Sequence, residues 1–353
     1  MSKLSINLIV FSAKESVYIP FLFESLKKQT FLDWEMLVID NGSDGDVLRL
    51  VEDNLKALNK PYRVLKQGAN VGFATGHNVG YKETQAPYIL LQNPDMYLLP
   101  DALEKMVNFL DQHQEVSTVS ARLMRWDFAS ICHPNDHLSS RTGIRDPVVR
   151  PYNKCLDSRF HGNDNFVPGA TNIIDALGLK IFRNRRVIEQ ATGQGWSRDV
   201  ILNEVKNLPL KVADPSVAMF PLDDSVEVFG VSGAFPMYRR SAILDTLLPN
   251  GDFLDSSYFM YKEDVDLAYR LASRGWKSFV LLDSVAYHDR VGVGSKELSD
   301  LSALKNKKSH SSLVKYYSYK NHLMTIYKNE YGQNFILDFP WILWYEFKKL
   351  VYF

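Results

Sequence analysis

Four short segments of this 353-residue chain carry side chains that could bind a metal ion or move a proton. In chain order they are Asp40-Asn41-Gly42-Ser43, Asn70-Val71-Gly72-Phe73-Ala74, Asn93-Pro94-Asp95 and Glu263-Asp264-Val265-Asp266. Three of the segments contain carboxylates, which together with water and phosphate oxygens are the ligands that Mg²⁺ and Mn²⁺ prefer. The pattern therefore indicates a site for a metal ion and a nucleotide.

Two of these segments follow apolar runs that predict buried strands, Met36–Ile39 and Tyr88–Leu91. Their acids would emerge at the carboxyl ends of parallel strands, where open α/β sheets bind ligands. Asp40 could accept a hydrogen bond from a nucleobase or ribose, and Asp95 could hold a cation that bridges two phosphates. Both acids also have an ordinary explanation, since aspartates stabilise turns and cap helices.

The second segment predicts the start of a helix in which glycines recur from Gly72 to Gly80 at every fourth position. Such glycines let a helix lie close to a sheet at an entropic cost of about 1 kcal/mol each. Asn70 and the first amides of the helix could in addition face a phosphate or sugar. Both explanations are compatible with the sequence.

The last segment places three acids, Glu263, Asp264 and Asp266, in the first turn of a predicted helix. One acid would suffice to complement the helix dipole. The preceding aromatic run Tyr258–Tyr261 would desolvate a carboxylate and raise its basicity, so that it could take a proton from a hydroxyl group. His288, which follows the next predicted strand, is either a structural histidine or a contact to the metal ion or diphosphate.

Strands alternate with helices over the first 121 residues, which predicts an α/β fold with a mostly parallel, Rossmann-like sheet flanked by helices. The run Val228–Phe235 predicts a further strand rich in small residues. We expect four regions: a half over 1–125 that carries the predicted nucleotide and metal motifs, an irregular region over 126–227 with an ordered island at about 174–190, a half over 228–295 that carries the acidic helix start, and a helical tail over 296–353. The family resemblance described below implies that the first half binds a nucleotide-sugar and that the second is the acceptor and catalytic half.

The tail contains nine Lys and five acids (9 − 5 = +4) and ends in a segment rich in aromatic residues. This composition predicts either a helix packed on the catalytic domain or one lying in an anionic membrane interface, at the inner leaflet. The eight aromatic residues of this last segment, Phe335–Phe353, are Phe335, Phe339, Trp341, Trp344, Tyr345, Phe347, Tyr352 and Phe353.

The overall composition is that of a globular protein with 41 basic and 41 acidic side chains. Zero net charge gives no reason to expect nucleic-acid binding. Two cysteines exclude a cysteine metal cluster, and the N-terminus lacks a signal-peptide cleavage pattern. We therefore expect a cytoplasmic protein with a possible peripheral contact to the inner membrane.

Taken in order, these motifs resemble those of family 2 glycosyltransferases, which have the GT-A fold, and most closely the bacterial rhamnosyltransferase-like branch. The resemblance covers Ile6–Ala121 and Val228 to about Lys328, and it includes Gly233-Ala234. It implies an inverting enzyme that moves a sugar from a nucleotide-diphospho-sugar, preferably dTDP-rhamnose, to a saccharide or lipid-linked saccharide acceptor in cell-surface polysaccharide synthesis.

The resemblance also implies roles for individual residues. Asp264 corresponds to the catalytic base, with Glu263 and Asp266 as supporting acids, while Asp95 with His288 would hold Mg²⁺ or Mn²⁺. Asn93 replaces the first acid of the family's Asp-x-Asp element. The residues expected to contact nucleotide or substrate are Ser12, Asp40, Asn41, Ser43, Asn70, Gly72, Phe73, Asn78, Asn93, Gly233 and Ala234.

Two other functions remain open at this stage. A nucleotidyltransferase would also use carboxylates and Mg²⁺, but the turn after the first strand has only Lys14 and no glycine to grip a triphosphate. An inactive nucleotide-sugar-binding module is the other alternative, because of Asn93. Asp175-Ala176-Leu177-Gly178 looks like an acceptor-side element of the family.

Overall fold

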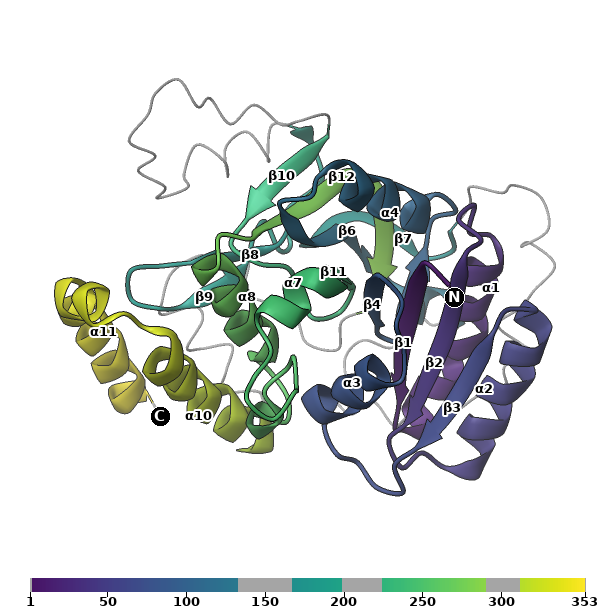
Figure 1. Cartoon of the computed structure of the whole chain (residues 1–353), viewed down its shortest axis with the longest axis horizontal. Coiled ribbons are helices and arrows are strands. Elements are labelled where there is room, and N and C mark those ends of the chain that lie inside the picture. The colour runs from purple at the N-terminus through teal and green to yellow at the C-terminus, as the bar shows by residue number, and fades with distance from the viewer. Residues whose placement is uncertain (1, 133–166, 199–223, 290–311, 353) are drawn as a thin grey trace.

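The computed structural model describes residues 2–132, 167–198, 224–289 and 312–352 (Figure 1). Among these, ten strands form one mixed sheet whose main order is β10-β12-β6-β11-β4-β1-β2-β3, with β5 added to β12 and β7 added to β6. A separate two-stranded sheet pairs β8 with β9. The strands are β1 (Leu4–Val10), β2 (Trp34–Asp40), β3 (Tyr62–Lys66), β4 (Tyr88–Gln92), β5 (Met96–Leu98), β6 (Val116–Trp126), β7 (Ala170–Ala176), β8 (Leu179–Ile181), β9 (Val187–Glu189), β10 (Ser225–Val228), β11 (Pro236–Arg239) and β12 (Lys277–His288).

Helices cover both faces of this sheet (Figure 1). The helices of the described ranges are η1 (Ala13–Val17), α1 (Ile19–Lys27), α2 (Gly45–Leu58), α3 (Phe73–Lys82), α4 (Ala102–Gln112), α5 (Phe128–Cys132), α7 (Arg240–Asp245), η4 (Ser256–Tyr258), α8 (Glu263–Ser273), α10 (Ser312–Asn329) and α11 (Gly332–Tyr352). Successive residues of a strand point to opposite faces. Leu90 of β4 accordingly joins the apolar core under α1, α2 and α4, whereas Ile89 and Leu91 join the core under α3, α7 and α8.

The strand directions explain where the functional side chains gather. β1 runs parallel to β2 and β4, and β2 runs parallel to β3, so that these strands end at the same edge of the sheet. β12 runs parallel to β6 but antiparallel to β5, which brings His288 opposite Met96. The predicted alternation of strands and helices is therefore confirmed for the first 121 residues.

Glycines bring α3 close to this sheet. A Cβ atom at Gly76 would lie 2.8 Å from the side chain of Ile9, and one at Gly80 would lie 2.7 Å from Asn7. The packing explanation for the four-residue glycine spacing is thus correct.

The described stretch 167–198, which includes the expected island at about 174–190, belongs to the folded body. Ile174, Leu177 and Ala191 pack against Val280 and Leu282 of β12. β7 pairs with β6 and extends the main sheet. Within the expected irregular region 126–227, residues 133–166 and 199–223 lie outside the described part of the chain.

Val228–Phe235 is not a continuous strand. β10 ends at Val228 and β11 begins at Pro236. Between them the N–H of Gly233 binds Asp264, and the carbonyl of Ala234 accepts from the N–H of Asn93 in the register of the β4–β11 ladder.

The described part of the C-terminal tail, residues 312–352, is helical, as expected, and helix α10 packs against α8 (Figure 1). Arg185, in the turn between β8 and β9, forms ion pairs with Glu330 and Asp338 and so ties the tail to the body. Of the helices in the described ranges, none combines the length and apolarity that crossing a membrane requires.

Candidate active site

The end of β2 and the start of α3 form the first part of the site. Asp40 ends β2, and its Oδ1 accepts hydrogen bonds from the backbone N–H (2.8 Å) and the hydroxyl (2.6 Å) of Ser43. This is the Asx-turn geometry typical of such a segment. Asp40 is thereby fixed at the carboxyl edge of the sheet, where the predicted nucleotide contact would lie.

Asn41 and Asn70 connect this turn to α3. The side-chain amide of Asn41 donates to Oδ1 of Asn70 (3.0 Å), and the N–H groups of Val71 and Gly72 donate to Asn41 (2.8 Å) and Asn70 (2.9 Å). These hydrogen bonds use side-chain atoms for which the sequence predicts ligand contact. Asn41 and Asn70 therefore stabilise the loop between β3 and α3.

Gly72 and Phe73 contact Phe259 of the distant loop before α8. Gly72 has φ +86°, and a Cβ atom there would lie 2.6 Å from the Phe259 ring, so only glycine fits. The N–H of Phe73 donates to the carbonyl of Phe259 (2.7 Å). The expectation that this first amide of α3 faces a phosphate is therefore wrong, because a protein carbonyl already occupies it.

Asn78 is also used inside the protein. Its carboxamide is buried, donates to the carbonyl of Leu254 (2.7 Å) and accepts from the N–H groups of Phe253 (3.1 Å) and Leu254 (3.0 Å). With both ends of the amide engaged by backbone, Asn78 holds the 253–254 segment on α3 and is not placed to contact substrate.

The loop after β4 carries Asp95, which lies beside His288 at the end of β12. Nε2 of His288 is 3.5 Å from Oδ2 of Asp95, and its Nδ1 is 2.8 Å from Oδ2 of Asp175. Burial alone would lower the pKa of His288, but the charges of the two carboxylates and the hydrogen bonds to them outweigh it and raise the pKa to about 10. His288 is therefore an imidazolium held between two aspartates.

This arrangement bears on the predicted metal site. A protonated imidazole has no lone pair to offer, so His288 serves as a charge partner of Asp95 and would ligate a metal ion only after losing its proton. Oδ1 of Asp95 is buried and accepts no hydrogen bond from the described part of the chain. That oxygen fits a cation whose other ligands are phosphate and water, which is the usual way in which Mg²⁺ is held. Within the described ranges, no three His, Cys, Asp or Glu side chains are grouped to hold a metal ion by themselves.

Asp175 and Glu15 are two buried acids near Asp95 and His288, and the sequence did not indicate this proximity. Asp175, expected on the acceptor side, lies fully buried behind His288. Glu15 accepts hydrogen bonds from the N–H groups of Phe11 (2.9 Å) and Ser12 (3.2 Å), and burial raises its pKa to about 7. Ser12 and Glu15 form a capping box on η1, a pattern that the Ser-x-x-Glu spacing could have revealed.

Asp264 and Glu263 begin α8. Oδ2 of Asp264 accepts from the N–H of Gly233 (3.1 Å), and Oδ1 accepts from the N–H of Val265 (2.8 Å). Burial and the charge of Glu189 raise the pKa of Asp264, while these two amide bonds oppose the rise. Burial and then the charge of Asp264 raise the pKa of Glu263, whose Oε2 accepts no hydrogen bond from the described residues.

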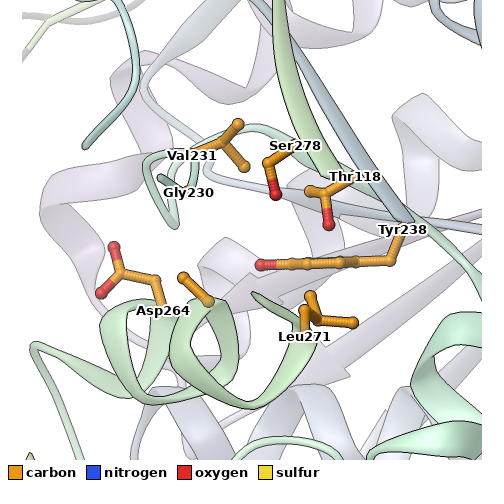
Figure 2. A pocket seen from close by; sticks show the side chains of 8 residues that line it. Thr118, Gly230, Val231, Tyr238, Asp264, Leu271 and Ser278 are labelled. Carbon is orange, nitrogen blue, oxygen red and sulfur yellow. The ribbon is translucent and has the colours of Figure 1, made fainter. Parts of the chain in front are cut away.

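Gly233 and Ala234 join the two acidic regions. The N–H of Gly233 holds Asp264, and the carbonyl of Ala234 accepts from the N–H of Asn93 (3.2 Å), two residues before Asp95. The region next to Asp264 is shown in Figure 2, where a small hollow lies between α8 and the sheet, with Thr118, Tyr238 and Ser278 on its sheet side. Asp264 lies at the edge of this hollow, and the Tyr238 hydroxyl points into it.

Asp266 does not belong to this group. It is fully buried and faces α10, where it binds Arg270 (3.0 Å), Lys328 (2.9 Å) and Asn329 (2.9 Å). Residues two positions apart on a helix point in nearly opposite directions. The predicted catalytic support by Asp266 is thus replaced by a structural role that anchors the C-terminal helix.

Comparison with known proteins identifies relatives for part of the chain. The model of glycosyl transferase family 2 matches residues 8–157. Teichoic acid poly(glycerol phosphate) polymerase of Staphylococcus epidermidis is 29% identical over 112 residues, which are 31% of this chain and 15% of that protein. Putative glycosyltransferase EpsE of Bacillus subtilis is 25% identical over 104 residues (30% and 37%). Poly(ribitol-phosphate) beta-N-acetylglucosaminyltransferase TarS of Staphylococcus aureus is 28% identical over 115 residues (32% and 20%). The matched segments thus span well under half of each of these relatives.

Among solved structures, GalNAc-T7 with UDP, GalNAc and Mn²⁺ superposes with a TM-score of 0.53 at 10% identity, over 90% of this chain and 50% of that one. The structure of S. aureus TarS with UDP has a TM-score of 0.48 at 14% identity, over 96% and 69% of the two chains. The fold is that of the GT-A glycosyltransferases, as predicted.

The pair of His288 and Asp175 predicts a pH-dependent stability. The pKa of His288 is about 10 in the folded state and about 6.5 when unfolded, so its contribution is complete below pH 6.5 and disappears as the pH rises through 10. We expect Asp175→Asn to lower the stability near pH 7 by about 3–5 kcal/mol, since it removes one partner of a buried ion pair. The loss relative to wild type should shrink towards pH 10.

Thermal unfolding in EDTA at several pH values measures this difference. Asp53→Asn serves as the control, because Asp53 is a largely exposed carboxylate on α2 whose ion pair in the described part of the chain is with Lys56 at 3.4 Å. A stability loss in Asp175→Asn that is equal at pH 7 and pH 10 would contradict the assignment of His288 as an imidazolium.

Proposed function

Because residues 8–157 belong to glycosyl transferase family 2, we propose that this protein transfers a sugar from a nucleotide-diphospho-sugar to a hydroxyl group of a saccharide acceptor, with inversion at the anomeric carbon. The observation that carries the proposal is the link formed by Gly233 and Ala234. These adjacent residues bind Asp264 through an N–H and Asn93 through a carbonyl, so the base and the Asp95 loop belong to one site.

Asp264 is the proposed general base. Its carboxylate is only partly buried, so an acceptor hydroxyl can reach it, and its raised pKa makes it a better proton acceptor than an ordinary aspartate. The amides of Gly233 and Val265 hold it in one orientation. Glu263 tends to keep its proton because a second buried negative charge beside Asp264 is unfavourable.

The donor side is built around Asp40 and Asp95. Asp40 lies at the strand edge for the nucleoside, and Asp95 with its unpaired Oδ1 faces the proposed diphosphate. A divalent cation bound at Asp95 would neutralise charge on the diphosphate as it leaves. His288 and Asp175 hold the Asp95 carboxylate in place, and no covalent enzyme intermediate is needed for a single displacement.

For the donor we propose two candidates to be tested side by side. The motif resemblance favours dTDP-rhamnose, and UDP-N-acetylglucosamine is included because the relative TarS is named as a beta-N-acetylglucosaminyltransferase. For the acceptor we propose a cell-surface polymer, free or lipid-linked, since relatives are named for teichoic acid and poly(ribitol-phosphate).

Replacing the proposed base tests the reaction directly. We expect Asp264→Asn to lower kcat by about 10²–10⁴-fold, because an amide cannot take the acceptor proton. Donor binding, measured by calorimetry, should change little. Asp53→Asn is the same chemical change outside the site and should transfer at the wild-type rate. Transfer by Asp264→Asn at a rate near wild type would reject this assignment.

Metal dependence is tested at Asp95. We expect a donor to raise the melting temperature of the wild type more with Mn²⁺ than with EDTA, because a ligand that binds only the folded state stabilises it. Asp95→Asn should lose this Mn²⁺-dependent increment, whereas Asp53→Asn should retain it. An equal increment in Asp95→Asn and wild type would show that Asp95 does not hold the cation.

We further propose that α11 lies on an anionic membrane surface. Ile342, Tyr345 and Lys349 form its buried face. The other side exposes Leu337 (68%), Trp341 (47%), Trp344 (58%) and Phe347 (53%) at helical spacing. Aromatic side chains together with nearby lysines are typical of helices that lie in a membrane interface.

Vesicle binding tests this surface. We expect the full-length double variant Trp341→Ser/Trp344→Ser to bind phosphatidylglycerol vesicles several-fold more weakly than wild type. Tyr327→Ser removes a 90% exposed aromatic residue from α10 and should bind as wild type does. Unchanged vesicle binding by the double variant would contradict the membrane contact. The contact would also be contradicted if the double variant still bound vesicles but no longer formed dimers in sedimentation.

A further inference from the structure

The loop Tyr258–Lys262 immediately before the proposed base has an unfavourable backbone conformation. Phe259 has φ +62° and ψ −60°, and the N–H of Met260 donates to the carbonyl of Tyr258 (2.7 Å). This is the rare form of the γ-turn. Tyr261 (φ +67°) and Lys262 (φ +70°) also lie in the left-handed region, which side chains with a Cβ seldom adopt. Such a loop persists only if its surroundings hold it.

Helix α10 supplies most of that support through one side chain. Asn321 is fully buried, and its Nδ2 lies within hydrogen-bond distance of the carbonyl groups of Tyr258 (2.9 Å), Met260 (2.8 Å) and Tyr261 (2.8 Å). The two hydrogens of this amide group are shared among the three carbonyl groups, and no apolar side chain could donate to any of them. Two further contacts from α10 hold this region. The ring of Tyr317 stacks on the Phe259 ring (5.2 Å between centroids), and Nζ of Lys320 donates to the carbonyl of Ser257 (2.6 Å).

The two ends of this loop reach both sides of the site. On the donor side, the carbonyl of Phe259 binds the N–H of Phe73, the first residue of α3. On the acceptor side, Lys262 is the N-cap of α8, so the loop sets where Glu263 and Asp264 begin. A shift of the loop would move the base relative to the donor.

We propose that Asn321 is a positioning residue for sugar transfer, whose carboxamide fixes the Tyr258–Lys262 loop and thereby places Asp264. The inference rests on the proposed transferase function. Asn321 lies outside residues 8–157, which match the family model. Within the described ranges it contacts neither the residues proposed to bind the donor nor the proposed base. It therefore acts through the loop and not on the reacting atoms.

The test uses Asn321→Ala, with Asn329→Ala as the matched control. Asn329 lies on the same helix and donates to Asp266 (2.9 Å) and the carbonyl of Thr325 (3.2 Å), but among the described residues it makes no hydrogen bond to the loop. We expect Asn321→Ala to lower kcat about 30-fold or more while the donor KM changes less than about three-fold. Asn329→Ala should lose stability without this loss of kcat.

Hydrogen exchange provides a readout that does not depend on activity. We expect exchange over 259–264 to speed up at least about ten-fold in Asn321→Ala and to stay near wild type in Asn329→Ala. Circular dichroism confirms that both variants are folded at the assay temperature.

The outcomes separate the two claims. If wild type transfers sugar, Asp264→Asn does not, and Asn321→Ala keeps wild-type kcat or wild-type exchange, the inference is overturned while the proposed function stands. If wild type transfers no sugar from any nucleotide-sugar donor, the proposed function fails, and with it the catalytic role of Asn321. Equal losses of kcat in Asn321→Ala and Asn329→Ala would reduce Asn321 to general stability and also overturn the inference.

Discussion

Burial of several carboxylates around the ends of β4 and β12 and the start of α8 is the constraint that the other contacts must satisfy. An uncompensated buried charge is unfavourable, so each acid requires a partner. Asp95 and Asp175 share one imidazolium, Asp264 binds two backbone amides, and Glu15 binds two more. The compensating partner thus differs from one acid to the next, being an imidazolium at some and backbone amides at others. The acids therefore differ in their chemistry.

Backbone groups supply much of this compensation, which explains the irregular stretches near the site. Gly233 must leave the strand pattern so that its N–H can meet Asp264. Gly72 must have a positive φ and no Cβ so that Phe259 can approach α3. Non-glycine residues in the left-handed region cost about 1–3 kcal/mol each. Phe259, Tyr261 and Lys262 carry that cost next to the proposed base.

The sequence allowed the sheet, the positions of Asp40, Asp95 and Asp264, and the helical tail to be predicted, because each depends on local periodicity and on the ends of strands. The roles of Asn78 and Asp266 could not be predicted in this way. Both are polar residues of helices that begin at proposed site residues, yet helix geometry turns them to another face. Partners far apart in the chain, such as Asp175 and His288 or Asn321 and Tyr258, leave no local signal at all.

The division of the site along the chain has a consequence for specificity. Asp40 and Asp95 lie within residues 8–157, the family-matched segment, whereas Gly233, Asp264 and Asn321 lie beyond it. The residues proposed for the donor thus lie in the segment that matches the family model, and the proposed base lies outside that segment. The link from Asn93 to Ala234 is made by backbone atoms, so it survives side-chain changes on either side. Under the proposed function, the half that contains Asp264 can therefore vary in sequence while the proposed base stays aligned with the Asp95 loop.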